Sequence, residues 1–149
     1  MSKPEAPSVA FAHHVRETCL CLGTQRAARA LARIFDDALR PVGITSGQFS
    51  LLMTMARPEP QTYANVSSIL GMDRTTLTAN LKPLERRGLV KIIVDRKDKR
   101  ARLLTLTAEG RVVLAKAAPI WKKTHAMVET RVTHASPDAL RADLDALCA

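Results

Sequence analysis

Between residues 73 and 106 the hydrophobic pattern changes from a helical to an extended period, and this change most limits what the chain can fold into. In the first half, leucines recur four and three residues apart and so share one helix face: they are Leu77, Leu81 and Leu84. Gly88 then ends the helix, and apolar residues occupy every second position of 90–94, as in a strand. Residues 102–106 repeat the extended pattern. The segment therefore predicts a helix followed directly by a β-hairpin.

The same segment carries most of the positive charge. Residues 73–102 contain ten Lys or Arg and four Asp or Glu, an excess of six, whereas the whole chain of 149 residues has a formal net charge of +9. Charge gathered in this way on a helix and a hairpin indicates contact with a polyanion. Binding to an anionic membrane usually requires aromatic residues opposite the cations, and this window has none. Nucleic acid is therefore the better partner.

The composition favours helices. Apolar residues make up 46% of the chain and aromatic residues only 3%. Helices pack well through small and aliphatic side chains, whereas β-sandwiches use more aromatic ones. The fold class expected is mainly α with a small β-hairpin, in one domain over residues 1–149. No apolar run approaches the roughly 20 residues that span a bilayer, and a signal-peptide pattern is missing, so a soluble, cytoplasmic protein is expected.

Helical periodicity and helix-ending residues predict the other elements. The expected helices cover residues 9–39, 46–56, 63–70, 73–87, 108–132 and a short C-terminal segment. Three of them follow residues that suit an N-cap, namely Asp73, Thr107 and Ser136. Pro119 is expected to bend the helix that contains it.

Two short helices separated by Gly71 and Met72 match a helix-turn-helix. The second presents small polar side chains opposite its leucine stripe, and threonine offers a hydroxyl and a methyl group to base edges in the major groove. Arg74 and Lys82 can reach guanine edges or phosphates, and Asn80 can read adenine. Phosphate contacts on the preceding helix are expected from Tyr63, Ser67 and Ser68. The alternative is a solvated helix face without a ligand.

A basic turn beside this helix-turn-helix completes a winged-helix pattern. Five cations lie within Arg96–Arg102, and a protruding basic tip can enter the narrow minor groove, where the potential is most negative. Asp98 is expected to pair with a neighbouring arginine and hold the tip rigid. The turn could be only a soluble connection, but its place after a helix-turn-helix favours binding to double-stranded DNA.

These motifs resemble the MarR family of bacterial transcription regulators. The resemblance covers about residues 10–148 and rests on DRTTLT-x-NL-x-PLE-x-x-GLV from Asp73 and on DRKDKRARLLTLTAEG from Asp95. It implies an obligate homodimer on a short pseudo-palindrome, with one recognition helix in each half-site. It also implies that Arg100 enters the minor groove, braced by Asp98. Ala79 departs from the pattern, because close relatives of this type often carry arginine there.

The expected DNA-binding residues are Arg74, Thr75, Thr76, Thr78, Ala79, Asn80, Lys82, Arg86, Arg96, Lys97, Asp98, Lys99 and Arg100. Residues 45–107 are assigned to the winged helix-turn-helix part, and residues 9–40 and 108–148 to a helical dimerisation part. A physical argument supports the dimer. Long helices rich in Ala and Leu at both ends of the chain cannot all cover their apolar faces against one small domain, whereas a two-fold partner would cover them.

Cys19 and Cys21 fall early in the first expected helix. Positions two apart lie about 200° from each other around a helix, so one cysteine is expected to face the core, and a disulfide between them is not expected. Two interpretations follow: buried structural cysteines, or the redox sensor that some MarR relatives carry near this position. The tyrosines that usually support such a sensor are missing, since Tyr63 is the chain's single tyrosine.

No metal, cofactor or enzymatic activity is expected. The four histidines do not form a metal-ligand spacing with the cysteines, and catalytic sequence motifs are absent. In the family a phenolic or other aromatic acid often acts as the effector. Its possible anion partners are Arg16, Arg26, Arg29 and His125, although the favoured interpretation of each is a surface or interface charge.

The sequence therefore predicts a homodimeric repressor of a pseudo-palindromic operator, released by a small-molecule effector. One alternative is a redox-sensing MarR-type regulator that uses Cys19 or Cys21. Another is a protein that coats DNA without sequence preference. A third, an enzyme with a cysteine nucleophile, has no supporting motif.

Overall fold

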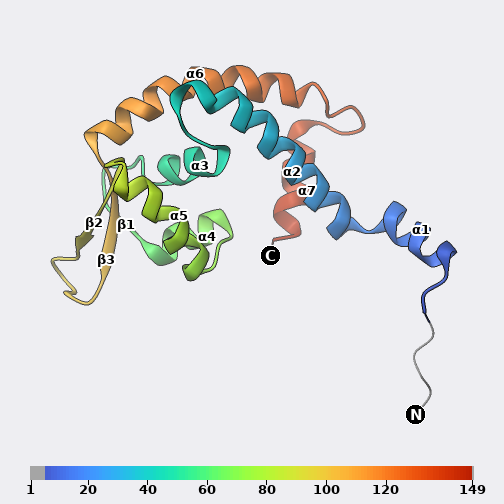
Figure 1. Ribbon diagram of the computed structural model, residues 1–149, viewed down its shortest axis with the longest axis horizontal. Coiled ribbons are helices and arrows are strands. Elements are labelled where there is room, and N and C mark those ends of the chain that lie inside the picture. The colour runs from blue at the N-terminus through green and yellow to red at the C-terminus, as the bar shows by residue number, and fades with distance from the viewer. Residues whose placement is uncertain (1–5, 149) are drawn as a thin grey trace, which may run out of the picture. The chain divides into compact units, whose positions relative to one another are not determined.

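A computed structural model describes residues 6–148, which divide into two compact units between Ile34 and Phe35. The first unit contains helix α1 (Val9–Thr18) and the first part of helix α2 (Leu20–Leu39) (Figure 1). Ser8 begins α1, because its hydroxyl oxygen accepts a hydrogen bond from the Phe11 N–H at 3.1 Å.

The predicted single helix over residues 9–39 is wrong at Cys19. This residue is extended, with φ −71° and ψ 108°, and it separates α1 from α2. Its N–H still donates to the Val15 carbonyl, while its sulfur accepts from the Leu22 N–H at 3.4 Å. Cys19 therefore ends one helix and caps the next, and the 200° argument that separated it from Cys21 does not apply. In this single chain Cys19 is half-buried and Cys21 is exposed.

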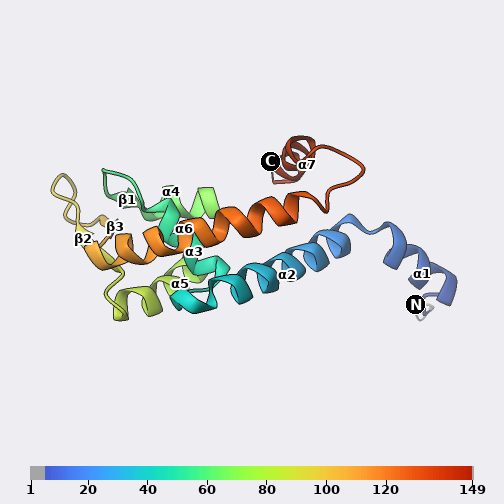
Figure 2. The same cartoon turned by 90° about the horizontal axis from the view of Figure 1, so that it is seen from above.

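The second unit contains the rest of α2 and all later elements. They are the 3₁₀ turn η1 (Arg40–Val42), α3 (Ser46–Thr54), β1 (Gln61–Thr62), α4 (Tyr63–Leu70), α5 (Arg74–Arg86), β2 (Val90–Val94), β3 (Arg102–Leu106), α6 (Ala108–Glu129) and α7 (Pro137–Ala146). The predicted mainly helical fold class is confirmed. α6 is one helix through Pro119 and is drawn from above as an uninterrupted ribbon in Figure 2.

The strands form one antiparallel sheet in the order β1-β3-β2. The predicted hairpin is confirmed, with Val90 opposite Leu106 and Val94 opposite Arg102. Strand β1 was not predicted, since two residues are too few to show a period. Its Gln61 lies opposite Leu104 and its Thr62 opposite Leu103, so the returning strand of the hairpin is the centre of the sheet.

The core of this unit combines the helix-turn-helix with the base of the hairpin. The predicted stripe of α5 is fully buried, at 0–1% exposure for Leu77, Leu81 and Leu84. On the sheet, Leu104 is also fully buried, whereas Val94 at the outer end of β2 is 50% exposed. The hairpin therefore leaves the core toward its tip, and it projects as a free loop in Figure 1.

Two glycines set the helix-turn-helix geometry. Gly71 ends α4 with φ +60°, and Gly88 follows α5 with φ +69°. Both values lie in the left-handed region that glycine adopts without steric cost. The abrupt turn predicted between α4 and α5 and the stop predicted at Gly88 are thus confirmed. Within residues 6–148, none of the helices is both long and apolar enough to span a bilayer.

Candidate nucleic-acid interface

Asp73 fixes the first turn of α5, as its N-cap spacing predicted. One carboxylate oxygen accepts from the Thr76 N–H at 2.8 Å, and the other accepts from the Thr76 hydroxyl at 2.9 Å. These hydrogen bonds lower the pKa of Asp73. Because the Thr76 hydroxyl donates to Asp73, this predicted site residue stabilises the first turn of α5. Its methyl group is the part of the side chain that remains for a contact with DNA.

Five of the predicted DNA-binding residues gather on one exposed face of α5. A shallow hollow of about 370 Å³ runs along this face, and its lining residues are Arg74, Thr75, Thr78, Ala79 and Lys82. The Thr78 hydroxyl donates to the Arg74 carbonyl at 2.8 Å, which leaves its methyl group and an oxygen lone pair for another contact. The face is therefore small and cationic, and it lies opposite the buried leucines.

Two further predicted residues of α5 lie apart from this hollow. Asn80 is exposed, but its side-chain amide donates to the Thr76 carbonyl of its own helix at 2.9 Å. Arg86 is exposed in the last turn. For Asn80 to read a base, its amide would have to leave the helix backbone.

The preceding helix contributes differently from what its sequence suggested. The Tyr63 ring lies beneath the Arg74 guanidinium, with the Cζ atom 5.4 Å from the ring centroid. The Ser67 hydroxyl is buried without a hydrogen-bond partner among the described residues, so the predicted phosphate contact from Ser67 is wrong. Ser68 is exposed.

The hairpin tip is held by its two aspartates through the backbone. The Lys97 N–H donates to the Asp95 carboxylate, and the Arg100 N–H donates to the Asp98 carboxylate, both at 2.9 Å. The Ala101 N–H also donates to the Asp98 carbonyl. In the first two contacts a short acidic side chain accepts the hydrogen bond in place of a backbone carbonyl. Asp98 therefore accepts backbone amides of the tip, and the predicted pairing of its carboxylate with an arginine side chain is not found among the described residues.

The tip's cations remain available. Among the described residues, none of the ion pairs within 4 Å involves Asp98 or a cation of the tip, and Arg96, Lys97, Lys99 and Arg100 are all exposed. Arg102 differs, because its guanidinium donates to the Lys99 carbonyl at 3.0 Å. The tip therefore carries four exposed positive side chains on a turn whose backbone is held by hydrogen bonds, and such an arrangement favours an anionic ligand.

The base of the hairpin is tied to both flanking helices by Thr107. Its N–H donates to the Leu89 carbonyl, its hydroxyl donates to the Gly88 carbonyl at 2.6 Å, and the hydroxyl oxygen accepts from Gly110 N–H at 3.0 Å. Thr107 was predicted only as a helix cap. These contacts also connect the end of α5 to the start of α6, so they fix where the hairpin emerges.

The suggested effector residues belong to separate units. Arg16 lies 3.7 Å from Glu17 on α1, and Arg26 and Arg29 line an open hollow of about 390 Å³ along one side of α2. His125 belongs to α6 in the second unit. The three arginines and the histidine therefore do not share one unit.

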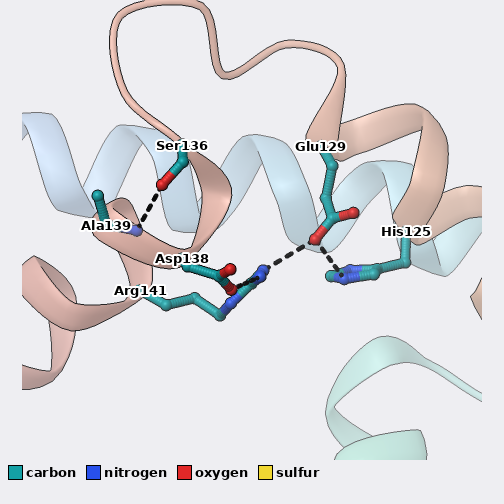
Figure 3. Close-up of polar contacts among 6 residues, drawn as sticks. All are labelled: His125, Glu129, Ser136, Asp138, Ala139 and Arg141. Atoms are coloured by element: carbon teal, nitrogen blue, oxygen red, sulfur yellow. Dashed lines mark hydrogen bonds and ion pairs between the residues drawn. The ribbon is translucent and has the colours of Figure 1, made fainter.

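His125 takes part in an aromatic stack and an ion-pair network. Its ring stacks on Trp121 at 4.5 Å between centroids, and Trp121 stacks on Phe49 at 6.0 Å. Figure 3 shows His125 and Arg141 meeting the same carboxylate of Glu129, at 3.1 and 2.9 Å. The hydrogen bond from Arg141 lowers the pKa of Glu129, and His125 adds to the effect.

Comparison with known proteins agrees with this geometry. The model of the MarR family matches residues 42–101, which include α3, the helix-turn-helix and most of the hairpin. The crystal structure of the Mycobacterium tuberculosis transcriptional regulator MosR in complex with DNA is similar, with 38% identity over 87% of this chain and 93% of that one and a TM-score of 0.79.

Three other proteins of known role or structure extend the comparison. The organic hydroperoxide resistance transcriptional regulator of Bacillus subtilis is 29% identical over 110 residues, 74% of this chain and 75% of that protein. The transcriptional repressor CouR bound to a 23-mer DNA duplex is 25% identical over 98% of this chain and 100% of that one, with a TM-score of 0.77. CouR from Rhodococcus jostii RHA1 bound to p-coumaroyl-CoA shares the fold, with 23% identity over 89% and 93% of the two chains and a TM-score of 0.72. The protein therefore belongs to the MarR family of winged-helix transcriptional regulators.

Proposed function

We propose that this protein is a homodimeric repressor that binds a pseudo-palindromic operator and releases it when a small molecule binds. The observation that supports this most is the exposed face of α5, where Arg74, Thr75, Thr78 and Lys82 line one hollow opposite a fully buried leucine stripe. A helix anchored on one side, with small polar and cationic residues on the other, suits the major groove.

In this proposal the α5 face reads bases and the hairpin tip grips the minor groove. Thr75 and Thr78 are short enough to let the helix approach base edges, and Arg74 and Lys82 reach guanine edges or phosphates. Arg100 enters the minor groove, with its backbone held by Asp98. MosR and CouR, both solved with DNA, support DNA binding by a chain of this fold.

The dimer follows from uncovered helices and from symmetry. None of the α7 residues is buried, and Leu140 and Leu144 on this helix and Leu147, its C-cap residue, are 40%, 41% and 60% exposed. A second copy of the chain would cover such residues and would place two α5 helices on two half-sites. We therefore assign residues 9–40 and 108–148 to the dimerisation part and residues 45–107 to the DNA-binding part. A transcription regulator of this kind is proposed to act in the cytoplasm.

We further propose an aromatic acid as the effector class. The stack of Phe49, Trp121 and His125 in the second unit offers aromatic surface for such a ligand. Arg16, Arg26 and Arg29 belong to the first unit and are tested as anion partners separately from this stack. CouR was crystallised with p-coumaroyl-CoA, an aromatic acyl ligand. An effector acts by binding better to a dimer whose α5 helices are wrongly spaced for DNA.

Competition footprinting tests the function. Genomic DNA upstream of the gene is labelled and protected with the protein in the presence of excess unlabelled random DNA. A protected inverted repeat of about 15–20 bp is the expected result, because two half-sites one helical turn apart occupy that length. Uniform protection that random DNA removes would instead support the coating alternative.

One observation favours a second candidate, a redox-sensing regulator. Cys19 lies at the break between two helices, where its sulfur accepts the Leu22 N–H, and Cys21 is exposed with its sulfur 3.3 Å from the Gln25 amide nitrogen. Accessible thiolates react with hydroperoxides to give a sulfenic acid and an alcohol. The similarity to the B. subtilis organic hydroperoxide resistance regulator adds support.

DNA release by cumene hydroperoxide separates the two candidates. A redox sensor loses its footprint on oxidation and recovers it with dithiothreitol. The response is abolished by serine at the cysteine that senses the oxidant, so Cys19→Ser and Cys21→Ser are measured separately and together. An unchanged footprint after oxidation of the unsubstituted protein would remove this second candidate and leave the first intact.

A further inference from the structure

The first residues of the two helices in the helix-turn-helix contact each other. Tyr63 begins α4 and Arg74 begins α5, and the guanidinium carbon of Arg74 lies over the Tyr63 ring at 5.4 Å from its centroid. A guanidinium within about 6 Å of an aromatic centroid is attracted by the ring's quadrupole. This attraction uses no N–H hydrogen bond of the guanidinium, so its donors remain free to form a bidentate contact.

Tyr63 is itself firmly held. It directly follows β1, whose Thr62 lies opposite Leu103 of the hairpin strand β3. The Thr62 hydroxyl oxygen accepts from the Asn65 N–H at 3.1 Å and so caps α4. The Tyr63 ring packs against the core, and burial is the largest cause of the raised pKa of its phenol, which therefore stays neutral. The ring is thus a rigid platform whose position depends on the sheet.

Arg74 has no other strong constraint among the described residues. The adjacent Asp73 carboxylate is committed to Thr76, and Arg74 takes part in none of the ion pairs within 4 Å that the described residues form. A long exposed arginine loses conformational entropy when it makes a directed contact. A ring beneath the guanidinium reduces that loss by restricting the side chain beforehand.

We infer that Tyr63 is a positioning residue for sequence recognition, which holds the Arg74 guanidinium in register with the hairpin for a base contact in the major groove. This inference rests on the proposed DNA-binding function. Strand β1 pairs with β3, Tyr63 directly follows β1, and the Tyr63 ring contacts Arg74. These contacts link the position of Arg74 on α5 to the sheet that carries the basic tip. Tyr63 acts through Arg74 and needs no contact of its own with DNA.

A double-mutant cycle on the duplex protected in the footprint tests this role. Tyr63→Leu removes the ring and is expected to weaken binding about two- to five-fold for each half-site, the range that an exposed cation–π contact supplies. Tyr63→Phe keeps the ring and is expected to bind like the unsubstituted protein. In an Arg74→Ala background, Tyr63→Leu is expected to cause no further loss.

The preferred bases supply the second readout. Selection from a random duplex library is expected to show that Tyr63→Leu broadens the preference at the same position in each half-site that Arg74→Ala broadens. If Tyr63→Leu unfolds the protein, Tyr63→Met replaces it, because a thioether fills the site without a ring. Thermal unfolding of each variant checks that the fold is kept.

Three outcomes overturn the inference. One is an equal loss from Tyr63→Leu with and without Arg74, which would mark a purely structural residue. Another is an unchanged base preference in Tyr63→Leu, and the third is a Tyr63→Phe protein as weak as Tyr63→Leu. Failure of the proposed function looks different, because the unsubstituted protein would then show no protected or selected sequence.

Discussion

Gly110 lies directly against the backbone of Leu89. A Cβ atom on Gly110 would come within 2.2 Å of the Leu89 carbonyl oxygen and 2.7 Å of a Leu106 methyl carbon. The first turn of α6 therefore packs on the start of β2 at a distance that only glycine permits. Together with the contacts of Thr107, this approach fixes the hairpin's base.

Gly110→Ala is expected to destabilise the protein by about 1–3 kcal/mol, the usual cost of overpacking a close contact. The measurement is urea unfolding followed by circular dichroism. Gly23→Ala is the matched control, since a Cβ atom at this position meets nothing within 4 Å. Alanine there is expected to raise the free energy of unfolding by about 0.5–1 kcal/mol, because glycine is unfavourable inside a helix. Equal stability of the two variants would show that the approach of α6 to β2 is not tight.

Asp73→Ala is expected to lower the melting temperature, because it removes the acceptor for two hydrogen bonds from Thr76. The folded-state pKa of Asp73 is lowered, so its stabilisation is present above the ordinary pKa and is lost as the pH falls toward the folded value. The melting difference between the two proteins should therefore shrink below roughly pH 4. A difference that stays constant down to about pH 2 would contradict this account of the cap.

Arg100→Ala is expected to weaken operator binding and to make it less dependent on salt. Removing one phosphate or groove contact per subunit should reduce the slope of log K against log salt by about 1 for each subunit bound. Fluorescence anisotropy across a series of KCl concentrations measures the slope. Lys116→Ala, which removes an exposed cation from α6, is the control, and matching slopes for the two variants would remove Arg100 from the interface.

Arg141→Ala is expected to loosen α7 from α6. Arg141 contacts Glu129 of α6 at 2.9 Å and Asp138 of α7 at 2.6 Å, and α7 has no buried residue to hold it otherwise. Hydrogen exchange of residues 137–146 should therefore be faster. Arg131→Ala is the control, because Arg131 is exposed and forms no ion pair with the described residues. Unchanged exchange in Arg141→Ala would show that other contacts hold α7.

The same Glu129 carboxylate gives a pH dependence. Its pKa is lowered in the fold, first by Arg141 and then by His125, so its contribution to stability is present above its ordinary pKa and is lost as the pH falls through the lower folded value. Protection of α7 should accordingly fall at acid pH in the unsubstituted protein. The Arg141→Ala protein should show a smaller fall.

Local patterns predicted the elements that position the site. The leucines of α5 and the alternation in residues 90–94 each repeat often enough to indicate one structure, and Asp73, Thr107 and Ser136 all cap helices as expected. Strand β1 was missed because two residues show no period, and its existence depends on Leu103 and Leu104 lying opposite it. The break at Cys19 was missed since no Gly or Pro marks it.

The sequence predicted which residues lie on the exposed face of α5 more completely than it predicted which atoms those residues contact. The lining residues of the α5 hollow follow from the helical period once Leu77 is known to be buried. The partner of Asp98 did not follow, because an aspartate in a basic turn can bind a guanidinium or a backbone amide, and only the path of the chain decides between them. The constraint on Gly110 and the contact of Arg74 with Tyr63 each join two different elements, and the hydrophobic period within one element does not predict such contacts.

Selection of duplexes from a random library by the purified protein tests the central claim most directly. If α5 reads bases as one of two symmetric helices, the enriched duplexes should contain an inverted repeat whose half-site centres lie about 10–10.5 bp apart. Complexes with these duplexes should hold two chains. Recovery of unenriched DNA, or of a single half-site bound by one chain, would contradict the account.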